Sequence, residues 1–462
     1  MTAPSTALTW AQQRFDTFAT PDPRRRTRLV QMAAAALDHP AGRVTRVFPQ
    51  AAAQQGAYDW LEHPAADARA LARCEALATA RACRGDDFAW VAVDMTDLHI
   101  TDHDAAKDTG RLGTRRKPCR GFFVTTAFVL RADDSVAGVI AQTYWARPEG
   151  PPAERYGRPT EDKETRFWGL VGALTVVRLE AEAPGCRPWL LCDRGADFAE
   201  FILDNLSAAR LWTVRAKTDR RVIDPEHHRL RALVAAHPVL GWAAVADEDS
   251  EREPRRRVAR VALRATRVTL ELRTRVDRRQ WSTPVWAVSV QEENAPAGVE
   301  ALSWLLLTSY PCEDFADAVL VAQGYGRRSR IEEYHRVWKS GGCDVEAQQL
   351  RDAPTIEKWS RLLSSVAVRL IQLRDASRQQ PAVSAAEWFT PVEIEATVLL
   401  RAPRDHTPGV PPTLGRMVRW VAELGGYTGK SSGGPPGITV IGRGWERVEV
   451  AVEVLTKQRQ PP

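Results

Sequence analysis

Short apolar runs separated by polar turns fill the first half of the chain and predict the strands of a β-sheet. Val, Ile, Phe and Trp are frequent in these runs, and the polar sequence RADDS joins two of them as a hairpin. The expected strands cover residues 88–93, 121–130, 136–145, 189–192 and 211–217. Helical patterns over about 162–182 and from 197 onwards separate the later strands. Three antiparallel strands followed by helix, strand, helix and strand predict an α/β core with a mixed sheet.

The chain is longer than one hydrophobic core usually supports. At 462 residues it is expected to form about two to four domains. Alternating apolar and polar positions over about 218–300 indicate a β-rich insertion in the core. The predicted domains are a helical region over 1–70, the core with its insertion over 71–370, and a mainly helical carboxy-terminal region over 371–462.

Two aspartates follow apolar runs directly. Asp94 follows FAWVAV and Asp193 follows WLLC, so each is predicted at the carboxyl end of a buried strand. Asp97 competes with Asp94 but is expected in the turn beyond it, and Asp197 is expected to cap the next helix. Aspartate often ends strands for structural reasons, so neither acid by itself indicates chemistry.

Four polar residues with helical spacing provide a second feature. Tyr325, Arg328, Glu332 and Lys339 are separated by three, four and seven residues, which places them on one face of a regular α-helix. A carboxylate beside a guanidinium, a phenol and an ammonium can hold a divalent metal ion and grip a phosphodiester. An ordinary solvated helix face with salt bridges is the structural alternative for the Arg328/Glu332 pair.

The segment GYGRRSRIEEYHRVWKSGG, from Gly324 to Gly342, resembles the Y-x2-R-x3-E-x6-K signature of the bacterial cut-and-paste DDE transposases of insertion sequences. The resemblance implies a ribonuclease H-like catalytic core, and it implies that Glu332 completes a metal-binding triad with Asp94 and Asp193. One departure is Ser329, which stands where relatives often have an aromatic residue.

The resemblance also implies a mechanism. Two Mg²⁺ ions, for which Mn²⁺ would substitute, would be held by the triad and would serve four in-line attacks on phosphorus. These are cleavage at the transposon end, hairpin formation, hairpin opening and joining of the 3′ end to target DNA. Arg328 and Lys339 would clamp phosphates, and Tyr325 or Trp304 would receive a displaced base.

Local basic clusters indicate contact with DNA, although the net charge is only +6. They lie at Arg24 to Arg28, at Arg115 to Arg120 and between Arg255 and Arg279, and an arginine-rich surface that is merely solubilising is the alternative. The phrases D-P-R-R-x-x-R-L and A-x-Q-x-G-A-Y resemble the end-binding domain of these transposases. The candidate DNA-contact residues are Arg24, Arg25, Arg28, Gln54, Gln55, Tyr58, Arg215, Lys217 and Trp304.

Several functions are not expected from the sequence. The chain has no long apolar stretch and no signal-peptide pattern, and its seven cysteines show no CxxC pair, so a cytoplasmic, nucleoid-associated bacterial protein without zinc or disulfides is expected. The GKS at 429–431 lacks the glycine spacing of a phosphate-binding loop, so no nucleotide cofactor is expected. By resemblance, the carboxy-terminal region would pair two protomers in a synaptic homodimer on transposon-end and target DNA.

Two alternative functions remain open. A tyrosine recombinase would need an H-x-x-R motif, and HRLR at 228–231 supplies one in a polar segment. A non-catalytic DNA-binding regulator derived from a transposase would need no acidic triad.

Overall fold

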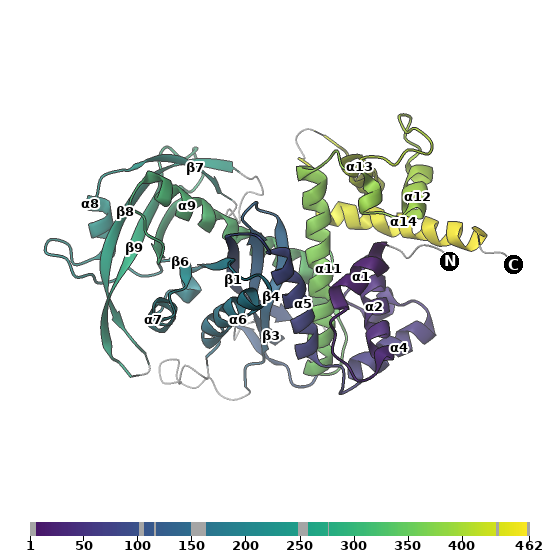
Figure 1. The fold of residues 1–462 in the computed structure, drawn as a ribbon, viewed down its shortest axis with the longest axis horizontal. Coiled ribbons are helices and arrows are strands. Elements are labelled where there is room, and N and C mark those ends of the chain that lie inside the picture. Colours follow the sequence, from purple (N-terminus) through teal and green to yellow (C-terminus); the bar gives the residue numbers. More distant parts are fainter. Residues whose placement is uncertain are drawn as a thin grey trace. The chain divides into compact units, whose positions relative to one another are not determined.

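The computed structural model describes residues 6–100, 106–114, 117–148, 163–247, 257–275, 277–430 and 434–459, and the chain divides into two compact units (Figure 1). Unit 1 comprises Met1–Ala78, Asp97–Phe122 and Tyr334–Pro462, and unit 2 comprises Thr79–Thr96 and Phe123–Glu333. Arg115, Arg116, Arg255 and Arg256 of the predicted basic clusters lie outside the described residues.

A large mixed sheet organises unit 2, in agreement with the predicted α/β class. Its order is β4-β3-β1-β5-β6-β10-β9-β8-β7, and β2 pairs with the first residues of β3 in unit 1. β5 pairs in parallel with both β1 and β6. The pairs β6–β10, β10–β9, β9–β8 and β8–β7 are antiparallel. The strands are β1 (Phe88–His99), β2 (Gly110–Thr114), β3 (Lys117–Arg131), β4 (Val136–Trp145), β5 (Arg187–Cys192), β6 (Leu211–Arg215), β7 (Gly241–Asp247), β8 (Arg257–Arg273), β9 (Gln280–Glu292) and β10 (Ser303–Thr308).

Helices flank this sheet within unit 2. The helix α6 packs on β4 and β5, and α9 packs on β7, β8 and β9. Their apolar residues, such as Val171 of α6 and Val321 of α9, are completely buried. The helices are α5 (Ala68–Ala82), α6 (Arg166–Glu182), α7 (Ala199–Ser207), α8 (Leu230–Ala236), α9 (Phe315–Gly326) and α10 (Arg330–Arg336), with α5 and α10 each continuing into unit 1.

Unit 1 is mainly helical. The long helix α11 packs on α2, α4, α13 and α14, and its buried residues include Trp359 and Leu363. Pro23 is the first residue of α2, and Asp22 Oδ1 accepts the Arg24 amide at 3.0 Å, which confirms the predicted proline start. The helices are α1 (Thr6–Phe15), α2 (Pro23–Asp38), α3 (Val44–Val47), α4 (Ala51–Glu62), α11 (Ala353–Gln379), α12 (Pro391–Arg401), α13 (Leu414–Leu424) and α14 (Ile438–Arg459).

Two local predictions were wrong. β1 does not stop at Asp94 but continues to His99, so Asp97 is an exposed strand residue rather than part of a turn. Asp197 does not cap α7, which begins after Phe198 without a side-chain cap. Instead the buried Asp197 carboxylate accepts the Lys217 amide at 2.7 Å and pairs with the Arg220 guanidinium at 2.5 Å. A buried carboxylate needs hydrogen-bond donors and a counterion, and the Lys217 amide and Arg220 supply both here.

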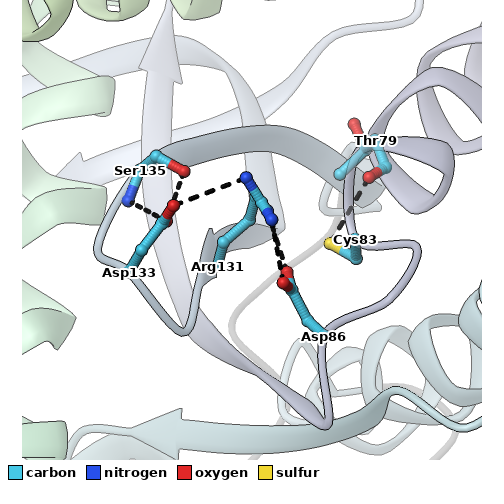
Figure 2. Close-up of polar contacts among 6 residues, drawn as sticks. All are labelled: Thr79, Cys83, Asp86, Arg131, Asp133 and Ser135. Carbon is cyan, nitrogen blue, oxygen red and sulfur yellow. Dashed lines mark hydrogen bonds and ion pairs between the residues drawn. The ribbon is translucent and has the colours of Figure 1, made fainter.

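The predicted RADDS turn joins β3 to β4 and fixes the segment that precedes β1. Figure 2 shows Arg131 at the end of β3 facing Asp86, and the two side chains form a bidentate pair with both hydrogen bonds at 2.8 Å. Asp133 accepts the Ser135 amide at 3.0 Å and also pairs with Arg131 at 3.4 Å. Because Asp86 comes just before β1, this pair fixes where β1 begins relative to the hairpin.

One close approach sets the distance between α9 and β1. A Cβ atom built on Gly324 of α9 would lie 2.4 Å from Cζ3 of Trp90 on β1. Trp90 is almost fully buried and packs on Trp189 of β5 with ring centroids 4.9 Å apart, so it has no room to retreat.

We expect Gly324→Ala to lower the free energy of unfolding by about 1–3 kcal/mol, because the added methyl group overpacks against Trp90. Gly326→Ala is the matched control, since its Cβ would meet nothing closer than 3.8 Å. Urea unfolding of both variants measures the difference. Equal stability of the two variants would contradict the tight packing of Trp90 on α9.

Candidate active site

Asp94 and Asp193 lie side by side at the edge where two parallel strands end their pairing. The register of β1 and β5 runs from Phe88 opposite Arg187 to Val93 opposite Cys192, so the next residue on each strand is one of the two aspartates. Both side chains are partly buried. This adjacency follows from the apolar runs that define the two strands.

Glu332 and Arg328 come from the chain that follows α9. The backbone there is not one regular α-helix as predicted: Arg327–Ser329 form a 3₁₀ turn, α10 holds Glu332 in its first turn, and Val337–Gly341 form a π-helix. These turns tighten and then widen the helix, so the predicted face of four residues is not a regular α-helical face.

Arg328 links the acids electrostatically. Its guanidinium donates a hydrogen bond to Glu332 Oε1, and its Nη1 lies 3.8 Å from Asp94 Oδ1. Burial raises the pKa of Asp94 to about 7; Arg328 opposes this shift, and Asp193 and Glu332 add to it. The four groups therefore form one coupled cluster in unit 2, with three acids around a single guanidinium.

The donor chemistry of the three acids fits a hard divalent cation. Carboxylate oxygens are the ligands that Mg²⁺ and Mn²⁺ prefer. A bound cation would oppose both the burial and the neighbouring acids that raise the pKa of Asp94. The oxygens of Asp94, Asp193 and Glu332 do not all lie within 4.8 Å of one another. Among the described residues, the acids whose oxygens all lie within 4.8 Å of one another are Asp38, Glu393 and Glu449 instead.

Two of the predicted site aromatics are buried. Trp304 on β10 and Tyr325 on α9 are only 5% and 4% exposed, and their rings pack edge to face with centroids 5.0 Å apart. In this arrangement neither ring offers a face on which a displaced base could stack. Ser329, the departure from the signature, donates from Oγ to the carbonyl of Gly326 at 2.9 Å and closes the 3₁₀ turn.

Lys339 belongs to unit 1, where it lies in the π-helix. Its Nζ forms an ion pair with Glu346 Oε1 at 3.2 Å, and the same oxygen accepts the His99 amide at 3.0 Å. Glu346 was not identified from the sequence, because its hydrogen bond joins it to His99, a strand residue far away in the chain.

Arg327, the neighbour of Arg328, was also missed. It forms a bidentate pair with Asp134 in the β3–β4 turn, one of whose hydrogen bonds is 2.9 Å long, and its guanidinium lies over the Trp90 ring at 5.4 Å from the centroid. The arginine doublet GRR was a signal in the sequence, but the partner could not be read from it. Arg327 therefore attaches the 3₁₀ turn that carries Arg328 to the β3–β4 turn.

The predicted DNA-contact residues of the amino-terminal region lie on two helices of unit 1 that pack together, α2 and α4. Arg24 is exposed, and Arg28 lies against Gly56, where a Cβ would approach its Nη2 to 2.8 Å. Arg25 is partly buried, with Nη2 at 2.9 Å from His63 Nε2. The α4 candidates are Gln54, Gln55 and Tyr58, all at least partly exposed.

The two weaker candidates lie around the end of β6. Arg215 donates to the Ser303 carbonyl at 3.2 Å, and Lys217 is exposed beyond the strand. The Lys217 backbone, rather than its ammonium, donates the hydrogen bond to Asp197.

The raised pKa of Asp94 predicts a pH-dependent stability. An aspartate with a pKa of about 7 when folded and about 3.9 when unfolded binds its proton more tightly in the folded state, so stability falls as pH rises from about 4 to 7. In EDTA, we expect Asp94→Asn to raise the free energy of unfolding at pH 8 by roughly 2–4 kcal/mol and to change it little at pH 4.5. Asp87→Asn, at an exposed acid just before β1, is the control. Urea unfolding at both pH values measures the effect, and an equal effect at both would contradict it.

The amino-terminal region is similar to a known protein family. Residues 7–66 match the family model described as transposase DNA-binding. The matched residues contain α2, α4 and most of α1, and they include both phrases from which DNA contact was predicted. No helix among the described residues is both long and apolar enough to cross a membrane. The chain thus begins with a region similar to the DNA-binding domain of transposases.

Proposed function

We propose that this protein is a DDE transposase, a metal-dependent DNA nuclease and strand transferase that cuts at the ends of a mobile element and joins them to target DNA. The observation that carries the proposal is the convergence of Asp94, Asp193 and Glu332 with Arg328 between them. A structural acid at a strand end needs no second and third carboxylate beside it.

Two further observations support the proposal. The order β4-β3-β1-β5-β6, with β1, β5 and β6 parallel, agrees with the expected ribonuclease H-like core. The amino-terminal match to transposase DNA-binding regions supplies a means of holding DNA that is separate from the acids. A nuclease that must act at particular ends needs both parts.

The residues of the site have distinct roles in this proposal. Asp94, Asp193 and Glu332 would hold two Mg²⁺ ions, which when bound activate the attacking oxygen and stabilise the leaving one. Arg328 would release Glu332 and turn to a phosphate of the DNA, because a guanidinium binds phosphate oxygens as well as it binds a carboxylate. Lys339 is the second candidate phosphate ligand, and Tyr325 and Trp304 would contact a base only after their present packing opens.

The hairpin pathway and a homodimeric synaptic complex are the finer parts of this proposal, and both rest on the resemblance of the signature. The main competing function is a DNA-binding regulator without catalysis. The match over residues 7–66 fits both functions, since either protein would bind DNA. Three coupled acids favour the enzyme, because a regulator gains nothing from keeping them together.

We expect Asp94→Ala, Asp193→Ala and Glu332→Ala each to abolish Mg²⁺-dependent cleavage of linear DNA that carries the ends of the element, while end binding persists. Asp97→Ala and Glu333→Ala are the matched controls, as acids close in sequence to two of the three. Denaturing gels measure nicking and also reveal any hairpin as a snap-back species. Wild-type cleavage by one of the three variants would exclude that residue from the triad. A wild-type protein that binds the ends but never cuts them would support the non-catalytic DNA-binding regulator.

End binding is expected to depend on one face of α2. Arg24 and Arg28 are four residues apart and share a face, so the Arg24→Ala, Arg28→Ala double variant should weaken binding to element ends. The salt slope should fall by about one for each DNA phosphate that the variant no longer neutralises. Arg26→Ala, on the opposite face of the same helix, is the control. Affinity measured over a range of salt concentrations tests this. Equal effects of the double variant and of Arg26→Ala would show that this face of α2 is not the DNA-binding surface.

A further inference from the structure

A second group of acids lies entirely within unit 1. Asp38 ends α2, Glu393 is in the first turn of α12, and Glu449 is in the middle of α14. One carboxylate oxygen of each lies within 4.8 Å of the others. Glu393 and Glu449 are only 4% and 6% exposed, so this is not a solvated acidic surface.

The buried charges of this group are poorly compensated. Glu393 Oε2 accepts the Thr390 amide at 2.5 Å and the Thr6 hydroxyl at 3.3 Å. Glu449 Oε1, in contrast, is completely buried and has no hydrogen-bond partner among the described residues. Within the same described part of the chain, no lysine or arginine forms an ion pair with any of the three acids.

A buried arginine on the same cavity has another partner. Arg369 lines the same cavity as Asp38 and Glu393, but its guanidinium lies over the Trp388 ring at 4.0 Å from the centroid. Burial lowers the pKa of Arg369 to about 10. None of the three acids contributes to this shift, so Arg369 is not their ion-pair partner.

An unpartnered buried carboxylate oxygen is costly, because its desolvation is offset neither by a donor nor by a counterion. Burial raises the pKa of Asp38 to about 7 and that of Glu449 to about 9, and it raises the pKa of Glu393 as well. The group must therefore either retain protons or bind a cation that supplies the missing positive charge.

The ligand set selects the kind of cation. All three donors are carboxylates, and no histidine or cysteine of the described residues belongs to the group, which favours hard cations over zinc or copper. The adjoining cavity of about 800 Å³ reaches Asp38 and Glu393 and leaves room for the water ligands that such cations keep.

We propose that Asp38, Glu393 and Glu449 bind one hard divalent cation, such as Ca²⁺, Mg²⁺ or Mn²⁺. The cation would join the end of α2 to α12 and α14, segments separated by more than half of the chain. It would therefore fix the helix that carries Arg24 and Arg28 to the carboxy-terminal helices. This site is separate from the proposed active site and does not depend on the transposase activity.

The test uses the full chain with Asp94→Asn, Asp193→Asn and Glu332→Gln combined, which removes the acids of the candidate active site. At pH 8 we expect this protein to bind one Mn²⁺ ion per chain, measured by the decrease of the free Mn²⁺ signal in electron paramagnetic resonance. Adding Glu449→Gln should abolish that binding. Glu453→Gln, at an exposed acid one turn further along α14, should leave it unchanged.

A second readout protects the test against a misfolded variant. Ca²⁺ should raise the unfolding temperature of the protein relative to EDTA, and neither Glu449→Gln nor Asp38→Asn should show this rise. Absence of Mn²⁺ binding in the triad-substituted protein, or binding that survives both substitutions, would overturn the proposal. In that case the three carboxyl groups keep protons, and Glu449→Gln would stabilise the protein equally with Ca²⁺ and with EDTA.

Discussion

The packing of Trp90 against Gly324 is the constraint on which the candidate active site depends. Trp90 lies on the strand that ends its pairing beside Asp94, and Gly324 lies on the helix that leads to Arg328 and Glu332. The indole fills the space next to position 324, so any residue larger than glycine there would push α9 away. The guanidinium of Arg327 covers the same ring. The distance between the two aspartates and the helical acid is therefore set by packing several residues away from the acids themselves.

The two acidic clusters are two solutions to the same electrostatic problem. In unit 2, Arg328 compensates part of the charge of Asp94 and Glu332. In unit 1, Asp38, Glu393 and Glu449 have no such cation among the described residues and lie closer together. Because a guanidinium binds phosphate as well as carboxylate, Arg328 could move from the acids to a phosphate ligand. The three acids of unit 1 form no ion pair with the described residues and need a proton or a metal ion instead.

Local patterns in the sequence predicted much of the fold. The apolar runs located the strands, and the acids that follow them were expected at adjacent strand ends because parallel pairing makes such ends neighbours. What the sequence did not predict depends on tertiary contacts. Asp197 was expected at a helix start because its partner Arg220 is distant in the chain, and Trp304 was considered a base receptor because its packing on Tyr325 leaves no local signature. The group formed by Asp38, Glu393 and Glu449 was missed for the same reason, since each acid alone has an ordinary helical context. The metal, the catalytic steps and the dimer remain predictions.

The way in which the chain passes between the two units has a consequence for how the protein could evolve. It crosses at Ala78/Thr79, Thr96/Asp97, Phe122/Phe123 and Glu333/Tyr334, and these points lie inside α5, β1, β3 and α10 respectively. Not one of these crossings is a loop, so neither unit corresponds to a segment of gene that could be exchanged by recombination without breaking a helix or a strand. The region that matches the transposase DNA-binding family lies upstream of α5 in one uninterrupted segment of unit 1, so a single recombination event could exchange it without breaking another element.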